Sequence, residues 1–322
     1  MKIALITPAG TGSRNGNRNT AVRWARLLRE SGYRVRLATQ WDGAPADLML
    51  ALHARRSHAS IRAFNDRYPE RALLVALTGT DLYRDIQTDH DAIDSLQRAT
   101  RLIVLQDQGP LELAPELRGK TDVVYQSARS VAAPPPLKDI FEVSLLAHLR
   151  EEKDPFCAAA ALAFLPARSR LHVRHYGKAL VEGMAATALE WMQQQTRYQW
   201  FGERPHHLVA RRLARSRALI ISSRMEGGAN AASEAIAQGV PTLASHIAGN
   251  IGMFGSDYAG YYPVGDAQAL ARLMLKIETD DAFRDLLTRQ TISRRALISR
   301  DRERDALRAS IAKALESLSD AV

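Results

Sequence analysis

The sequence predicts an α/β protein in which each half of the chain forms a doubly wound parallel sheet. Short apolar runs alternate with longer amphipathic stretches over all 322 residues, which is typical of β/α units. Three consecutive prolines, Pro134 to Pro136, interrupt this alternation and indicate a stiff connector between two domains. The stretch 218–241 has the pattern of a strand, a glycine turn and a helix, which points free backbone N–H groups at an anion.

The composition indicates a globular protein that is large enough for two hydrophobic cores. The chain is 46% hydrophobic and 25% charged, and its single cysteine, Cys157, excludes an intrachain disulfide. The apolar run 3–6 is too short for a signal peptide, and the run 156–165 is about half the length of a membrane span. We therefore expect a cytoplasmic protein without a membrane span.

The net charge of +9 indicates an anionic binding partner, such as nucleic acid or a small anionic substrate. The arginines are scattered along the chain, no basic run exceeds two residues, and no aromatic residues are interleaved with them. This distribution disfavours nucleic acid as a partner and favours small anionic substrates.

The first half begins with a predicted strand and a long polar loop. The predicted strands lie at 2–7, 34–38, 47–52, 72–77, 102–105 and 123–125. Residues 8–19 form the Gly-rich loop, and Asn19 or Thr20 caps a helix that ends at Gly32. The loop lacks a clean G-x-G-x-x-G, so it is not a simple dinucleotide site. A loop of this length at the carboxyl end of a first strand is expected to close over a ligand.

The second half repeats the alternation of strands and helices. The predicted strands lie at 141–147, 170–176, 198–201, 218–222 and 242–245. One predicted helix starts at 155, and another, after the second strand, ends at 195. Further helices are predicted at 205–215, 229–238, 266–279 and 301–318. No sequence repeat relates the two halves.

Two carboxylates flank the glycine turn of the second half. Glu226 precedes the predicted helix and Glu234 lies within it, on either side of the expected anion site. Carboxylates repel a phosphate at contact distance, so they are better suited to accept hydrogen bonds from sugar hydroxyls beside it. Phosphate and polyol together indicate a nucleotide sugar. The alternative is that both residues only favour the helix dipole and that the glycines form an ordinary turn.

The block from Glu226 to Glu234, followed by Ala235 and by Gly239 to Pro241, resembles the E-x7-E motif of the retaining glycosyltransferases of family 4. The resemblance implies that Glu234 binds the nucleotide ribose and that Glu226, Gly227 and Gly228 hold the donor sugar and diphosphate. The backbone amides of Ala229 and Asn230 complete this donor site. It also implies the GT-B fold: two Rossmann-like domains that face each other across a cleft. We expect an acceptor domain at 1–133, a donor domain at 134–300, and a helix at 301–322 that crosses back to the N-terminal domain.

The loop from His148 to Lys153 resembles the G-R-L-x-x-x-K loop of the same family. In that family the Arg and Lys neutralise the donor diphosphate. Lys153 matches directly, whereas His148 stands at the Arg position and Arg150 follows two residues later. The resemblance therefore implies that Arg150 and Lys153, with Glu226, form the catalytic group and that His148 binds the donor. A solvated charged loop is the alternative.

The loop Leu77 to Asp81 resembles the L-H-G-x-D loop of the family, with Thr78 in place of the histidine. A hydroxyl acceptor gains from a positioned base, which this loop lacks. Cationic or potentially cationic residues follow the nearby strands instead. The candidate acceptor residues are Arg14, Gly16, Asn17, His53, Arg55, Arg56 and Thr78, with Arg18 beside them. This set suits an anionic acceptor that is already a nucleophile, although each cation taken singly is also typical of a solvated surface.

Five segments together resemble the selenosugar synthases of selenoneine biosynthesis over nearly the full length. They are TPAGTGSRNGNRNTA, ALHARRS, LTGTDLYRDI, HLREEKDPF and SSRMEGGANAASEAI. The resemblance implies transfer of the sugar of UDP-N-acetylglucosamine or UDP-glucose to selenophosphate, which gives a 1-selenosugar and UDP. The alternatives are a hexosyltransferase acting on a hydroxyl of a glycan, lipid or small molecule, and a sugar-nucleotide sensor without turnover.

The sequence gives no convincing metal site, and we expect neither a metal nor another cofactor, since the UDP-sugar is a substrate. Asp89, His90 and Asp91 have D-x-D form, but they follow a polar stretch, so Asp89 is expected to cap a helix. Cys157 lies among alanines and is expected to pack in a core. Neither the anomeric outcome nor the oligomeric state follows from the sequence.

Overall fold

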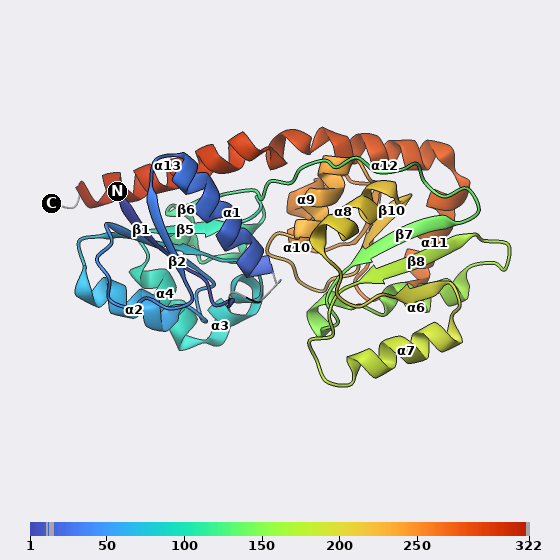
Figure 1. The fold of residues 1–322 in the computed structure, drawn as a ribbon, viewed down its shortest axis with the longest axis horizontal. Helices are drawn as coiled ribbons and strands as arrows, with labels where there is room; N and C mark the ends of the chain where they lie inside the picture. The colour runs from blue at the N-terminus through green and yellow to red at the C-terminus, as the bar shows by residue number, and fades with distance from the viewer. Residues whose placement is uncertain (11, 13–15, 320–322) are drawn as a thin grey trace. The chain divides into compact units, whose positions relative to one another are not determined.

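The chain forms two compact α/β units in this computed structural model, which describes residues 1–10, 12 and 16–319. The first unit comprises Met1–Ser127 and Ser299–Val322, and the second comprises Ala128–Ile298. Each unit contains a six-stranded sheet in which all neighbouring strands are parallel (Figure 1). The predicted α/β class with two parallel sheets is confirmed.

The sheet of the first unit has the order β2-β1-β3-β4-β5-β6. Its strands are β1 (Lys2–Ile6), β2 (Arg34–Ala38), β3 (Leu48–Leu52), β4 (Ala72–Ala76), β5 (Arg101–Val104) and β6 (Thr121–Val123). The strands β3 and β4 are buried throughout, as expected for the centre of a parallel sheet. Because β3 and β4 are neighbours, the loops that follow them meet at one edge of the sheet.

Helices cover the two faces of this sheet (Figure 1). The helices α1 (Gly16–Glu30) and α13 (Arg300–Ser319) contribute Trp24, Leu28, Leu307 and Ile311 to one hydrophobic core. On the other face, α2 (His58–Arg67) and α4 (His90–Arg98) contribute Ile61, Phe64 and Leu96 to a second core. The final helix thus packs on the sheet of the first unit.

The sheet of the second unit has the order β12-β11-β10-β7-β8-β9. Its strands are β7 (Phe141–Leu146), β8 (Leu171–Tyr176), β9 (Tyr198–Trp200), β10 (Ala218–Ile221), β11 (Thr242–Ser245) and β12 (Tyr261–Tyr262). Its α-helices are α6 (Cys157–Ala161), α7 (Met184–Gln194), α8 (His206–Arg215), α9 (Asn230–Gln238), α10 (Ala248–Phe254), α11 (Ala267–Thr279) and α12 (Asp281–Ser293). The neighbours β7 and β10 bring the His148–Lys153 loop next to the glycine turn.

The division between the units differs from the expected boundary before Pro134. The N–H of Ala128 donates to the carbonyl of Ile298 (3.3 Å), and that of Val131 donates to Oε1 of Gln238 (3.2 Å). These bonds tie the segment that precedes the prolines to the second unit. The same division assigns Ser299 and Arg300 to the first unit with α13.

Some expected elements start or end elsewhere. The helix α1 begins at Gly16, before the expected caps Asn19 and Thr20, and Thr20 Oγ1 donates to the carbonyl of Gly16 (2.9 Å) inside its first turn. The expectation that Gly16 and Asn17 lie in a loop was therefore wrong. The strand β6 begins two residues before the expected 123–125 run and shares Val123 with it, because its pairing with β5 begins at Thr121.

Several helical segments were not predicted from the sequence; most of them span seven residues or fewer, whereas α12 spans 13. These are a π-helical turn at Asp81–Asp85, α3 (Ile86–Thr88), α5 (Pro115–Arg118), α10 and α12. Asp89 caps α4 and accepts from the N–H of Ala92 (3.0 Å), which confirms its predicted role. Cys157 is buried and forms no disulfide. Within the described part of the chain, none of the helices combines the length and apolarity that a membrane span requires.

Candidate active site

The first group of candidate residues lies at the carboxyl ends of β7 and β10 in the second unit. Ser222 and Ser223 end the apolar strand β10, and Ser222 Oγ donates to the carbonyl of Lys153 (2.9 Å). The N–H of Arg224 donates to the carbonyl of Glu152 (2.8 Å). These two bonds hold the His148–Lys153 loop against the glycine turn, so the sheet brings together the two predicted motifs.

Glu226 is the centre of this group. Its carboxylate is ion-paired with the Lys153 ammonium, and Oε1 also accepts from Ser223 Oγ (2.6 Å). Glu226 is buried, and the Glu226 carbonyl lies 1.9 Å from where a Cβ on Gly249 would sit, so only glycine fits at that position of α10. Ser223 and Gly249 support Glu226. The sequence analysis assigned a role to neither: Ser223 was only part of a resembling segment, and Gly249 belongs to no motif.

The Arg150 side chain is partly buried in the same loop as Lys153, whose backbone N–H donates to the carbonyl of Arg150 (3.0 Å). Its Nε has no hydrogen-bond partner among the residues that the structure describes, although it is shielded from solvent. A buried guanidinium N–H without a partner is costly unless a ligand supplies an acceptor. This loop therefore offers an anion the unpartnered Nε–H of Arg150 and the ion-paired ammonium of Lys153.

His148 contributes a hydrogen-bonding group rather than a positive charge. Its Nδ1 accepts from the N–H of Lys178 (3.0 Å), so Nε2 carries the proton of the neutral ring. Burial lowers the pKa of His148, and the positive charges of Arg150 and Lys153 lower it further. His148 is thus a neutral N–H donor beside the predicted clamp.

Glu234 lies on α9, one turn beyond the N-terminus of this helix. The side chain of the N-cap residue, Ala229, makes no capping hydrogen bond. Glu234 Oε1 lies 2.9 Å from Nε2 of His206, an exposed residue at the start of α8. The carboxylate predicted to bind ribose therefore has a protein partner, and sequence reasoning gave no signal for His206 because it is distant along the chain.

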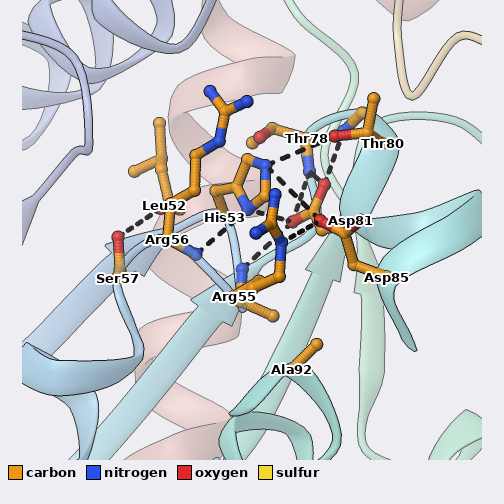
Figure 2. Close-up of polar contacts among 12 residues, drawn as sticks. Leu52, His53, Arg55, Arg56, Ser57, Thr78, Thr80, Asp81, Asp85 and Ala92 are labelled. Carbon is orange, nitrogen blue, oxygen red and sulfur yellow. Dashed lines mark hydrogen bonds and ion pairs between the residues drawn. The ribbon is translucent and has the colours of Figure 1, made fainter. Parts of the chain in front are cut away.

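The second group lies at the carboxyl ends of β3 and β4 in the first unit (Figure 2). Asp81 is fully buried and joins the two loops: it accepts from the N–H groups of Ala54 (3.1 Å), Thr78 (3.1 Å) and Gly79 (2.8 Å). Asp81 starts the π-helical turn, a structure that is frequent at functional sites. It occupies the acidic position of the family loop, which was its only signal in the sequence.

His53 lies between two carboxylates in this group (Figure 2). Its Nδ1 is 3.8 Å from Asp81 Oδ2, its Nε2 is 4.0 Å from Asp85 Oδ2, and its Nε2 is 3.4 Å from Thr80 Oγ1. The backbone of His53 has a positive φ of 71°, which is strained for a residue with a side chain. Burial lowers the pKa of His53 more than Asp81 raises it, so the imidazole is neutral at pH 7.

The remaining acceptor candidates differ in their surroundings. Arg55 Nε donates to Asp85 Oδ2 (2.8 Å), and this bond raises the pKa of Arg55. Arg56 is exposed, and its guanidinium forms no ion pair with any residue in the described ranges. Thr78 Oγ1 is buried and has no partner in the same ranges. Arg14 lies outside the described residues.

This group is therefore less cationic than the sequence indicated. His53 is neutral and Arg55 is balanced by Asp85, a residue that was not predicted. Asp85 follows Asp81 by one turn, and so reaches the same edge of the sheet. Among the described residues, no cluster of three or more His, Cys, Asp or Glu side chains has the arrangement of a metal site.

A comparison with protein-family models finds one match, in the second unit. Residues 145–296 match the family model "Glycosyl transferases group 1", and this segment contains the whole first group of candidate residues. A comparison with curated protein sequences finds no match.

Solved structures share the fold over the whole chain. Anabaena HepE in complex with UDP is 17% identical, with a TM-score of 0.75 over 98% of this chain and 100% of HepE. Sucrose-phosphate synthase from Thermosynechococcus elongatus is 17% identical, with a TM-score of 0.79 over 100% of both chains. A glycosyltransferase from Rickettsia africae is 13% identical, with a TM-score of 0.72 over 99% of both chains. The second unit thus matches the glycosyl transferases of group 1 over most of its length, and the chain as a whole has the GT-B fold.

Proposed function

We propose that this chain is a glycosyltransferase whose donor is UDP-N-acetylglucosamine or UDP-glucose. The observation that carries the proposal is the Lys153–Glu226 ion pair at the ends of β7 and β10, with the unpartnered Nε of Arg150 in the same loop as Lys153. It lies inside the segment that matches the family. HepE was solved with UDP and also with UDP-glucose, at 16% identity and a TM-score of 0.72, which supports a uridine nucleotide.

The donor roles follow from the chemistry of these side chains. Arg150, Lys153 and the backbone amides of 227–230 stabilise the negative charge that grows on the diphosphate as it leaves. Glu226 orients the sugar through its hydroxyls, with its carboxylate held by Ser223. Glu234 binds the ribose, which takes the place of His206 as its partner. The Nε2–H group of His148 donates a hydrogen bond to an oxygen of the UDP-sugar.

We assign selenophosphate as the acceptor, because five segments resemble the selenosugar synthases. Selenium attacks the anomeric carbon, a carbon–selenium bond forms, and the bond from that carbon to the diphosphate breaks. The bonding electrons leave with UDP. Water then cleaves the selenium–phosphorus bond and releases phosphate, which leaves the 1-selenosugar. Selenophosphate arrives deprotonated and needs no protein base.

On the acceptor side, Arg56 is the described cation best placed to bind this anion, since it is exposed and forms no ion pair with described residues. Arg14, Arg55, Gly16 and Asn17 remain further candidates for the acceptor site, from their positions in the sequence. The free Thr78 Oγ1 offers a hydrogen bond where the family has a histidine.

One observation favours a second candidate, transfer to a hydroxyl. His53 is neutral and lies between the carboxylates of Asp81 and Asp85. A neutral imidazole in such surroundings can act as the general base that a hydroxyl acceptor requires. The positive φ of His53 is a further feature of a residue held for function.

The deciding experiment measures UDP release from UDP-N-acetylglucosamine and from UDP-glucose, with and without selenophosphate. Release that depends on selenophosphate, together with a selenium-containing sugar in the mass spectrum, supports the first candidate. Release that depends only on a hydroxyl acceptor and is lost in His53→Ala supports the second. No release with either kind of acceptor would overturn the transferase assignment.

A further inference from the structure

One face of the first sheet lacks the helix that the fold would place there. The strands β1 and β2 are connected through α1, which covers the face that carries Ile3, Leu5 and Val35. The next connection, from β2 to β3, spans residues 39–47 and contains no helix. Parallel sheets are normally covered by crossover helices on both faces. The face opposite α1 is therefore left without a crossover helix at its β2 edge.

A cavity of about 520 Å³ lies at this β2 edge, and its lining includes Arg29 of α1 as well as residues of the β2–β3 connection. Side chains alternate along a strand, so the face opposite α1 carries Lys2, Ala4 and Ile6 from β1, and Arg34, Arg36 and Ala38 from β2. The exposed positions of this face carry the cations Lys2, Arg34 and Arg36, whereas Ala4 and Ile6 are buried. The volume lies within the roughly 300–1,000 Å³ range of small-molecule sites.

The loop that closes the cavity is held in place. The N–H of Trp41 donates to Ser60 Oγ (3.0 Å), and Trp41 Nε1 donates to the carbonyl of Ala44 (3.0 Å). The Trp41 ring packs edge-on against Phe64, with 5.3 Å between centroids. Arg36 is ion-paired with Asp42. The cavity is thus formed in advance and does not depend on a ligand to order its wall.

The charge at the cavity is positive. Its lining contains four cations and one carboxylate, and the further carboxylate of Asp47 accepts from the backbone N–H of Lys2 (2.7 Å). The register pairs Lys2 with Arg34 at one end of the strands, and Ile6 with Ala38 at the other. The Lys2 ammonium and the Arg34 guanidinium form no ion pair with any described residue. Two adjacent unpaired cations repel each other, and an anion between them relieves that repulsion.

We propose that this cavity binds a small amphiphilic anion. The apolar body lies against Ala38 and Trp41, partly buried apolar side chains of the lining, and the anionic head group lies between Lys2 and Arg34. One turn of an α-helix, about 10 Å wide and 5.4 Å long, already fills roughly 400 Å³. The cavity therefore suits a small molecule better than a helix of a partner protein. Lys2 and Arg34 begin their strands, whereas the candidate active site lies at carboxyl ends, so this ligand is not the acceptor.

The test uses decyl phosphate and its uncharged counterpart decanol, each titrated against the full chain by displacement of the fluorescent dye 8-anilinonaphthalene-1-sulfonate. Decyl phosphate is expected to displace the dye more tightly than decanol, and inorganic phosphate is not expected to displace it. Arg34→Ala should weaken decyl phosphate by about tenfold and leave decanol nearly unchanged. The matched control is Arg26→Ala, an exposed arginine of α1 on the opposite face.

A cavity-filling variant provides the second arm of the test. Ala38→Phe should abolish displacement by both compounds, with its folding checked by circular dichroism. If that variant does not fold, the comparison of Arg34→Ala with Arg26→Ala still decides. Equal weakening by these two variants, displacement by inorganic phosphate, or full binding by a folded Ala38→Phe would each overturn the proposal. Anionic vesicles that displace the dye when dissolved decyl phosphate does not would assign the surface to a membrane instead. None of these readouts requires turnover, so they do not depend on the proposed transferase activity.

Discussion

The ammonium of Lys153 is ion-paired with the carboxylate of Glu226, across two loops that follow neighbouring strands of the second sheet. Both side chains are largely buried, so the pair is shielded from solvent screening. The pair positions a cation and a sugar-binding carboxylate together. Each of the two buried charges is also compensated by the other, so the loss of one residue destabilises the other.

The first prediction concerns this pair. Lys153→Met should lower kcat for UDP release by about 10²–10³, because a charge that stabilises the leaving diphosphate is lost. The same change leaves Glu226 buried without its partner and should lower the melting temperature. The double variant Lys153→Met with Glu226→Gln should regain thermal stability but not kcat. A Lys153→Met enzyme with kcat within about threefold of wild type would remove Lys153 from the clamp.

The second prediction separates ribose binding from chemistry. Glu234→Ala should raise KM for the UDP-sugar by about tenfold and change kcat much less, because the ribose contact is made in ground and transition states alike. His206→Ala is the matched control: it removes the partner of Glu234 but keeps the carboxylate, so KM should not rise. Steady-state kinetics with the donor varied give both constants. A collapse of kcat at unchanged KM would move Glu234 into the chemical step.

The third prediction concerns the acceptor. Arg56→Ala should raise KM for selenophosphate several-fold while KM for the UDP-sugar stays the same, since Arg56 is exposed and forms no ion pair with described residues. Arg55→Ala should weaken both substrates, because it leaves Arg84 as the one arginine that is ion-paired with Asp85 among the described residues of the group around His53. Thr78→His, which restores the family residue, should give no gain with selenophosphate. Kinetics with each substrate varied in turn measure these effects, and an Arg56→Ala effect confined to the UDP-sugar would contradict the assignment.

The fourth prediction concerns the pH dependence of stability. His175 is fully buried: its Nε2 donates to the carbonyl of Ala147 (2.8 Å), and its Nδ1 accepts from the Tyr198 hydroxyl (2.7 Å). Burial lowers the pKa of His175 to about 4 from its ordinary 6.5. Between these values the unfolded chain binds a proton that the folded chain does not. The free energy of unfolding should therefore fall as the pH decreases from 6.5 to about 4, by about 3 kcal/mol in all.

The matched variant for this effect is His175→Gln, whose amide can keep both hydrogen bonds but does not titrate. Urea unfolding at pH 7 and pH 4.5 should show a smaller loss of stability for the variant than for wild type. The difference isolates His175 from His53 and His148, whose pKa values are also lowered by burial. Equal losses in both proteins would show that His175 does not carry the effect.

The fifth prediction concerns the attachment of the last helix. Glu303 of α13 is almost fully buried; its carboxylate accepts from Arg23 Nε (2.9 Å), Trp24 Nε1 (2.8 Å) and the N–H of Ser127 (3.0 Å). Glu303→Ala should cost about 3–5 kcal/mol, because it removes the carboxylate that accepts from the buried Trp24 N–H and balances the Arg23 charge. Glu316→Ala, an exposed change on the same helix, should cost little. Denaturant unfolding compares the two, and equal effects would refute the role of Glu303.

The sequence by itself determined the class of fold and the two motifs of the second unit. Alternation of apolar runs with amphipathic stretches is a local property, so β1, β2 and β11 lie where their residues predict them. The glycine turn, the helix α9 and the cap at Asp89 likewise depend on neighbours in the sequence. The start of α1 was misplaced because Gly16 is a weak helix former, and the first turn is set by its contacts rather than by propensity.

Only the tertiary structure decided which of these residues meet. Lys153 and Glu226, Arg55 and Asp85, and His206 and Glu234 are each far apart along the chain, and sheet order or helix packing brings them together. The same contacts made the candidate acceptor group less positively charged than the sequence predicted, because the carboxylates of Asp81 and Asp85 lie beside His53 and Arg55. The cavity beside β2 exists because the β2–β3 connection contains no helix. Hydrophobic patterning specifies which face of an element is buried, but not which distant element covers it, so charge pairing and cavities are properties of the assembled fold.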